Sequence, residues 1–248
     1  MKAPEMKAAM SAKTPMVGVS IMFSSPQLVE MIAALGFDWV LIDCEHGSID
    51  LSNLEMMAIA AKAAGITAIA RPPSNSSIDI MRVMDRGVDG VQVPHIKSQK
   101  EAKAAVESVK FHPLGNRGLA MGTRPSNYGI GVELDQYSKT SNLDSIVVLQ
   151  IEDREAIENL DEILSVADVD VFFVGPSDLS QSLGHPGKAN KPPVSTAITK
   201  IFRSIAEAGL TSGTASSEKQ MEKAKKEGCC YLYTHLNNVL KLGAENYL

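Results

Sequence analysis

The 248-residue sequence lacks the cysteine pattern of a disulfide framework or a zinc site. Its three cysteines, Cys44, Cys229 and Cys230, are an odd number, two of them are adjacent, and none has zinc-type Cys/His spacing. Disulfide-rich secreted domains carry spaced cysteines in even numbers, so this pattern favours a reducing compartment. We therefore expect a cytoplasmic protein that is stabilised by its core.

Long apolar runs and an excess of basic residues are also missing. No stretch approaches the ~18 apolar residues of a membrane helix, and residues 1–13 mix Lys and Glu with Ala without an apolar signal core. The formal net charge is −5, and the 24 Lys and Arg residues are scattered. Nucleic-acid-binding domains are usually basic, so we expect neither a nucleic acid nor a membrane as partner.

Short apolar runs alternate with helical segments along most of the chain. The predicted strands are 16–21, 39–42, 67–71, 90–94, 145–151, 169–174, 210–214 and 230–233. Continuous apolar strands are typical of a parallel sheet that is buried on both faces. The pattern predicts an α/β fold with one domain over residues 1–248, a (β/α)8 TIM barrel. An open doubly wound sheet is the alternative, although no glycine-rich dinucleotide turn follows the first strand.

Two segments fall outside this alternation. Residues 1–14 are expected to be an extended or disordered N-terminus. Residues 111–142 hold many Gly, Pro, Ser and Asn residues and predict a long loop. A loop of this length inside a compact domain is usually functional.

Titratable and polar side chains follow the carboxyl ends of successive predicted strands. They are Asp43, Glu45, His46, Arg71, His95, Gln150, Glu152 and Asp178. In a TIM barrel these ends meet on one face, where active sites lie. Taken alone, Asp43, Glu45 and His46 could be a helix-capping turn with an ordinary loop histidine. Polar side chains also follow the later strands, and this repeated pattern favours a functional site. His95 is interpreted as a loop residue and His235 as a capping or core residue.

Glu152 and Asp178 are the candidate metal ligands. Two carboxylates from neighbouring strands suit a hard divalent ion such as Mg or Mn. The alternative is that both cap helices. Arg71 has a planar guanidinium group that suits a carboxylate or an enolate oxygen. The alternative interpretation of Arg71 is a structural ion pair with Asp43. No lysine lies within a predicted strand, so carbanion chemistry would depend on a metal rather than on a Schiff base.

A set of motifs, in order along residues 16–187, carries a family resemblance. The motifs are Gly36–His46, Ala70–Pro72, Val93–Pro94, Pro113–Gly118, Gln150–Glu152, Phe173–Ser180 and Leu183–Gly184. Together they resemble the HpcH/HpaI family of class II aldolases. The resemblance implies a metal-dependent barrel that cleaves a 4-hydroxy-2-oxo acid into pyruvate, or a close relative, and an aldehyde.

The resemblance also assigns roles to individual residues. It implies that Glu152 and Asp178 hold Mg, Mn or Co, that Arg71 stabilises the enolate oxygen and that His46 accepts the proton of the 4-hydroxyl group. Asp43 and Glu45 would position Arg71 and His46. The residues that would bind substrate with Arg71 are Gln150, Gly175, Pro176 and Ser177.

Subunit assembly is a further implication of the resemblance. Asp85 matches an acid that, in the family, pairs with the catalytic histidine across a subunit boundary. That boundary and the family's exchange of C-terminal helices imply a homo-oligomer, a hexamer built as a trimer of dimers.

Some positions depart from the family pattern. Ser20 stands where a bulky aromatic residue is usual, and Tyr231–His235 lacks the usual Gly-x-Asp pattern. These departures leave the aldehyde and the 2-oxo acid open. Two alternatives to an aldolase also remain: a CoA-ester lyase of the citrate lyase β or malyl-CoA type, for which no basic cluster is visible, and a barrel that binds a 2-oxo acid without turnover.

Overall fold

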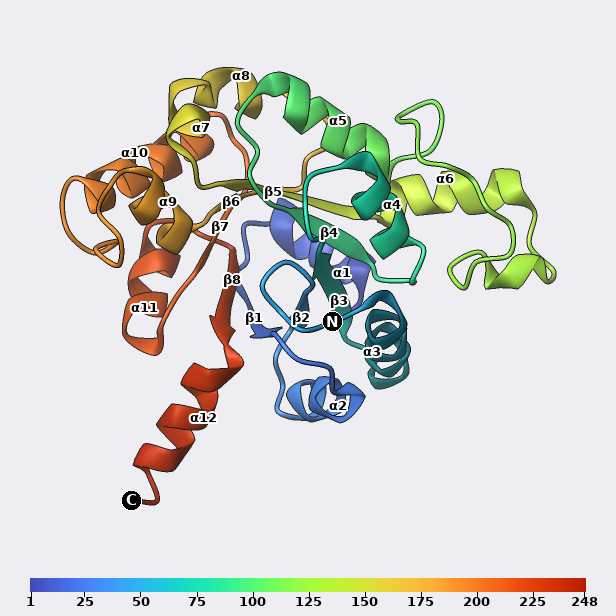
Figure 1. The fold of residues 1–248 in the computed structure, drawn as a ribbon, viewed down its shortest axis with the longest axis horizontal. Helices are drawn as coiled ribbons and strands as arrows, with labels where there is room; N and C mark the ends of the chain where they lie inside the picture. Colours follow the sequence, from blue (N-terminus) through green and yellow to red (C-terminus); the bar gives the residue numbers. More distant parts are fainter.

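Eight parallel strands close into one barrel in the computed structural model, which describes all of residues 1–248 (Figure 1). The strands are β1 Met16–Ile21, β2 Trp39–Asp43, β3 Thr67–Arg71, β4 Gly90–Val93, β5 Ile146–Ile151, β6 Val171–Val174, β7 Ser212–Ala215 and β8 Tyr231–His235. Each pairs with its neighbours in sequence, and β8 pairs with β1. The single-domain TIM barrel is confirmed, and the open sheet is excluded.

Helices connect the strands and cover the outside of the barrel. They are α2 Pro26–Ala34, α3 Leu51–Ala64, α4 Ser77–Met84, α5 Gln99–Val109, α6 Leu134–Asp144, α7 Arg154–Glu158, α8 Leu160–Leu164, α9 Pro176–Ser182, α10 Val194–Glu207, α11 Glu218–Lys226 and α12 Leu236–Glu245, with a 3-10 turn at Asn127–Gly129. α2 begins at Pro26, because Ser25 Oγ accepts the N–H of Leu28 at 3.2 Å and proline suits the first helical position.

Packed aromatic rings fill the barrel interior. Trp39 stacks on Tyr231 with ring centroids 4.1 Å apart. Its register partner in β1 is Gly18, where a Cβ would overlap the indole ring. Phe173 and Tyr233 stack with their centroids 5.2 Å apart. Because the interior is a packed core rather than a pore, a substrate can bind only at an end of the barrel.

The expectation of an extended or disordered segment over residues 1–14 is wrong. Residues Ala3–Ser11 form α1. Met6 and Met10 are buried in the same cluster as Met16 and Trp39, on the inside of the barrel. The helix forms because Ala3, Met6 and Met10 share one buried face that closes the amino-terminal end of the barrel, while Lys7 lies outside that cluster.

The predicted loop over residues 111–142 is partly helical, because α6 begins at Leu134. This helix is polar and lies away from the barrel in Figure 1. Contacts with Phe111 help to anchor it. The Tyr137 ring packs on Phe111 at 5.5 Å, and the Asn142 side-chain amide bonds both the N–H and the carbonyl oxygen of Phe111.

The C-terminal helix, α12, projects away from the barrel (Figure 1). Leu240 is 62% exposed and Leu242 is 38% exposed. Both leucines therefore leave apolar surface open to solvent. None of the helices combines the length and the apolar character needed to span a membrane.

Candidate active site

The carboxyl ends of the strands surround a small pocket at one mouth of the barrel, which we call the mouth pocket. It has a volume of 140 Å³, and the site residues that line it are His46, Arg71, Glu152, Gly175, Pro176, Ser177 and Asp178. Three more expected residues, Asp43, Glu45 and Gln150, contact Arg71. The structure thus brings together side chains that are far apart in the sequence.

Two carboxylates hold Arg71 in place. Its Nε and Nη2 donate to the two oxygens of Asp43 at 3.0 and 2.6 Å, and Nε lies 3.1 Å from Glu45 Oε2. Burial raises the pKa of Asp43, but the hydrogen bonds and the charge of Arg71 outweigh it and hold that pKa below its usual range. The third guanidinium nitrogen of Arg71, Nη1, lies 3.5 Å from Gln150 Oε1.

Asp43 also orders the turn that presents His46. Its Oδ1 accepts the N–H groups of Glu45 and His46 at 3.1 and 3.2 Å. The imidazole of His46 is half exposed, and its Nε2 lies 3.8 Å from Glu45 Oε2. The histidine therefore stands at the rim of the mouth pocket with access to solvent.

A buried chain of hydrogen bonds holds the side chain of Gln150 in place. Gln150 Nε2 donates to Glu152 Oε2 at 2.7 Å, and Gln150 Oε1 accepts from Gln92 Nε2. The Tyr231 hydroxyl in turn donates to Gln92 Oε1 at 3.1 Å. Sequence reasoning missed Gln92 and Tyr231. A single amide in the otherwise apolar strand β4 is the feature that could have identified Gln92.

Glu152 and Asp178 follow the neighbouring strands β5 and β6. Glu152 is 1% exposed, and its Oε1 accepts the N–H of His95 at 2.9 Å. Burial raises the pKa of Glu152, and the nearby charge of Asp178 acts in the same direction. The carboxylate of Glu152 packs against the backbone of Gly175, where a Cβ would overlap Glu152 Oε2. Neither carboxylate caps a helix, since the N-cap residues of α7 and α9 are Asp153 and Gly175.

This pair of carboxylates fits a hard divalent cation. A cation would offset the burial and the charge of Asp178, which both raise the pKa of Glu152. Nowhere in the chain do three or more His, Cys, Asp or Glu side chains gather as a metal site. Glu152 and Asp178 would therefore hold the ion as a pair. Mg²⁺ is often bound in this way, through one or two carboxylates, with its other positions open to water and substrate.

Sequence reasoning gave too little weight to two histidines. His95 Nδ1 lies 3.0 Å from Asp153 Oδ2, and His95 Nε2 lies 3.4 Å from Glu45 Oε1. Burial lowers the pKa of His95, but these acids outweigh it and raise the pKa above its usual value. His235 makes no capping hydrogen bond and lines the mouth pocket. Both residues stand at the carboxyl end of a strand, which is the feature that could have identified them.

Asp85 lies apart from the mouth pocket. It is the C-cap of α4, and its carboxylate accepts a hydrogen bond from Arg117 at 2.7 Å. Since α4 follows the carboxyl end of β3 and runs back along the barrel, Asp85 lies toward the opposite end. Asp85 is thus the one expected site residue that lies away from the others in the folded chain.

Comparisons with known proteins agree with this architecture. The family model described as HpcH/HpaI aldolase/citrate lyase matches residues 17–231. A crystal structure of a family protein from Burkholderia cenocepacia superposes with a TM-score of 0.91 at 26% identity. That match covers 98% of this chain and 96% of the other.

Two curated relatives are similar over most of their length. The hydroxypyruvate/pyruvate aldolase of Sagittula stellata is 32% identical over 221 residues, covering 89% of this chain and 86% of the relative. The 5-keto-4-deoxy-D-glucarate aldolase of Shigella boydii is 34% identical over 207 residues, covering 84% and 79%. Both relatives are aldolases by name.

Proposed function

Because the chain belongs to the HpcH/HpaI aldolase/citrate lyase family, a family of lyases, we propose that it cleaves a 4-hydroxy-2-oxo acid into pyruvate and an aldehyde. The main observation that supports this proposal is that one pocket of 140 Å³ is lined by Glu152, Asp178, Arg71 and His46. Retro-aldol cleavage needs a base at the hydroxyl group and a sink for the electrons of the broken bond.

Glu152 and Asp178 would hold a divalent cation, Mg, Mn or Co. When bound, the cation supplies positive charge that stabilises the oxyanion of the 2-oxo acid. Gln150 supports Glu152 through their hydrogen bond and orients the substrate with its amide. Gly175, Pro176 and Ser177 form the wall of the pocket against which the pyruvyl group binds.

His46 accepts the proton of the 4-hydroxyl group, and the C3–C4 bond then breaks to leave an aldehyde. The electron pair of that bond moves into the pyruvate half and gives an enolate. Arg71 stabilises the enolate oxygen, since Asp43 and Glu45 hold its guanidinium in a fixed position before substrate binds. A proton delivered to the enolate carbon completes pyruvate.

We extend the proposal to a homo-hexamer, a trimer of dimers. Exchange of α12 between two subunits would cover the exposed Leu240 and Leu242. Asp85 lies away from His46 of its own chain, so it could assist only the His46 of a neighbouring subunit.

Pyruvate formation tests the proposed function. The purified protein is assayed with a panel of 4-hydroxy-2-oxo acids and Mg, Mn or Co, and again after chelation. We expect pyruvate release that chelator abolishes and that added metal restores. Cleavage that resists chelation would reject the role of Glu152 and Asp178 as metal ligands. Absence of pyruvate with every substrate, together with cleavage of malyl-CoA, would favour a CoA-ester lyase instead.

A further inference from the structure

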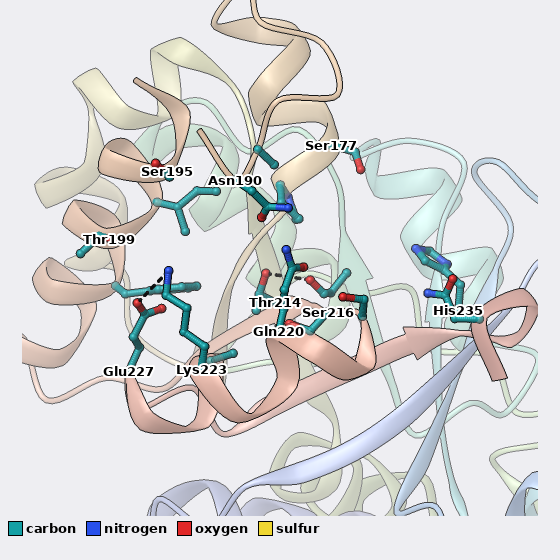
Figure 2. A pocket seen from close by; sticks show the side chains of 18 residues that line it. Ser177, Asn190, Ser195, Thr199, Thr214, Ser216, Gln220, Lys223, Glu227 and His235 are labelled. Carbon is teal, nitrogen blue, oxygen red and sulfur yellow. Dashed lines mark hydrogen bonds and ion pairs between the residues drawn. The ribbon is translucent and has the colours of Figure 1, made fainter. Parts of the chain in front are cut away.

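A second cavity opens beside the mouth pocket, and we call it the lateral cavity. It has a volume of 480 Å³ and lies between α10, α11 and the segment that joins α9 to α10 (Figure 2). The two spaces share four lining residues, Pro176, Ser177, Ala215 and His235. The lateral cavity is therefore a side chamber of the candidate active site rather than a separate feature of the surface.

Neutral hydrogen-bonding side chains line this chamber together with apolar ones. Only 5 of its 18 lining residues are hydrophobic. The polar side chains include Asn190, Ser195, Thr199, Ser216, Gln220 and Asn238. Its two charged residues, Lys223 and Glu227, form an ion pair with each other at 3.6 Å, as Figure 2 shows. The lining thus offers several donors and acceptors with no net charge. These groups can hydrogen-bond the hydroxyl groups of a ligand, and they provide no charge to attract an anion.

His235 stands where the two spaces meet. Its Nδ1 is buried without a hydrogen-bond partner, and its ring contacts Tyr233 edge-on at 5.5 Å. Burial lowers the pKa of His235, and the charge of Arg71 adds to this effect. Both favour the neutral imidazole, in which one nitrogen donates and the other accepts. Its register partner, Ser20, has a buried hydroxyl oxygen that also lacks a partner.

The volumes indicate which part of a substrate uses the lateral cavity. Small-molecule sites usually enclose about 300–1,000 Å³. The mouth pocket, at 140 Å³, holds the groups that act on the 2-oxo acid and has little further room. The part of the substrate beyond the broken C–C bond therefore needs another space, and the lateral cavity adjoins the mouth pocket at Ser177 and His235.

We propose that the lateral cavity binds the aldehyde half of the substrate and selects aldehydes that carry hydroxyl groups. This inference rests on the proposed aldolase function. In the direction of addition, the enolate carbon of pyruvate attacks the aldehyde carbon, and the aldehyde oxygen takes up a proton. Asn190 and Gln220 then hydrogen-bond the hydroxyl groups of the aldehyde, and a site built for such groups disfavours an analogue that lacks them.

The test compares two aldehydes of equal carbon number. Pyruvate addition to glyceraldehyde and to propanal is measured with Mn²⁺, and the ratio of the two kcat/KM values is the readout. We expect the unmodified protein to favour glyceraldehyde by about tenfold or more. In the double variant Asn190→Leu and Gln220→Leu the ratio should fall at least about tenfold, because the hydroxyl groups lose their partners. The ratio does not depend on the fraction of active protein, so partial misfolding cannot imitate this result.

The matched control is Arg203→Leu, on the exposed face of α10 and outside the cavity. This variant should keep the ratio of the unmodified protein. An unchanged ratio in the double variant, or a preference for propanal in the unmodified protein, would overturn the inference. Exchange of the methyl protons of pyruvate in D₂O, measured without aldehyde, tests the proposed function separately. If that exchange is absent, the aldolase proposal fails and the inference fails with it.

Discussion

Asp43 and Arg71 are register partners at the carboxyl ends of β2 and β3, and their side chains join through both carboxylate oxygens. The same buried carboxylate accepts the N–H groups of Glu45 and His46. One acidic side chain thus orders both the guanidinium and the turn that carries the candidate base. The geometry of the site is therefore set before any substrate binds, as preorganised electrostatic catalysis requires.

Arg71→Lys should lower kcat for pyruvate formation by about 10²–10³-fold, the usual cost of losing one preorganised donor to an oxyanion. A lysine keeps the charge but cannot bind Asp43 through two nitrogens and still face Gln150. Steady-state kinetics with one 4-hydroxy-2-oxo acid measure the effect. Metal affinity should stay near that of the unmodified protein, and a normal turnover would remove Arg71 from the mechanism.

Gly175→Ala should weaken metal binding by at least about tenfold, in the range found for residues that support metal ligands. The backbone at Gly175 has φ −86°, which alanine adopts without strain, so the only change is a Cβ that collides with Glu152 Oε2. Titration with Mn²⁺ followed by electron paramagnetic resonance measures the affinity.

Gly122→Ala is the matched control for that substitution, because a Cβ at Gly122 meets no atom within 4 Å. It should bind Mn²⁺ like the unmodified protein. Equal affinities for the Gly175 and Gly122 variants would mean that the carboxylate of Glu152 is not held where the metal binds.

Mixing two inactive variants tests the proposed subunit boundary. His46→Asn and Asp85→Asn should each be nearly inactive alone. Co-expressed, they should recover up to about a quarter of the normal activity, because some sites then join an intact His46 to an intact Asp85 from a neighbour across a symmetric interface. Mixed assemblies purified with two different affinity tags provide the measurement. Loss of activity in each variant without recovery in the mixture would place Asp85 in a structural role only.

Lys110 should make stability depend on pH. It is 2% exposed and donates to the carbonyl oxygens of Asn142 and Ser145 at 2.8 and 2.9 Å. Burial, and then the charge of Lys7, lower its pKa from 10.5 to about 8. Between these two values the unfolded chain binds more protons than the folded one, so the free energy of unfolding rises with pH.

Comparison with Lys110→Met isolates this effect. From about pH 8 to about pH 10, the unmodified protein should gain up to about 3 kcal/mol of stability relative to the variant, at about 1.4 kcal/mol per pKa unit. Urea unfolding at a series of pH values gives the difference. A difference that stays constant or falls with pH would show that Lys110 keeps its ordinary pKa in the fold.

Most of the barrel was predictable because most of its strands are apolar runs, and a titratable residue lies at or soon after the carboxyl end of several of them. The same feature predicts Glu152 and Asp178 as site residues. The N-terminal helix was not predictable in this way, since Met6 and Met10 find their apolar partners only after the barrel has closed. Its short Ala-rich sequence would be marginal as an isolated helix.

The positions of His95 and His235 in the site were also difficult to predict from local sequence patterns. His95 adopts a left-handed conformation with φ 54°, and this turn directs its N–H to Glu152 and its ring to Asp153. A local pattern cannot reveal such a turn, because the residues that hold it come from β5 and the segment after it. His235 reaches the mouth pocket through the closure of β8 on β1, and its place at the carboxyl end of a strand is the one local feature that points there.

A crystal of the protein soaked with Mn²⁺ and pyruvate, with the anomalous signal of the metal measured, tests the proposed mechanism most directly. We expect one anomalous peak in the mouth pocket that contacts an oxygen of Glu152 and an oxygen of Asp178, with pyruvate on its open side next to Arg71. A peak bound elsewhere, or carboxylates of Glu152 and Asp178 that do not share the ion, would contradict the mechanism.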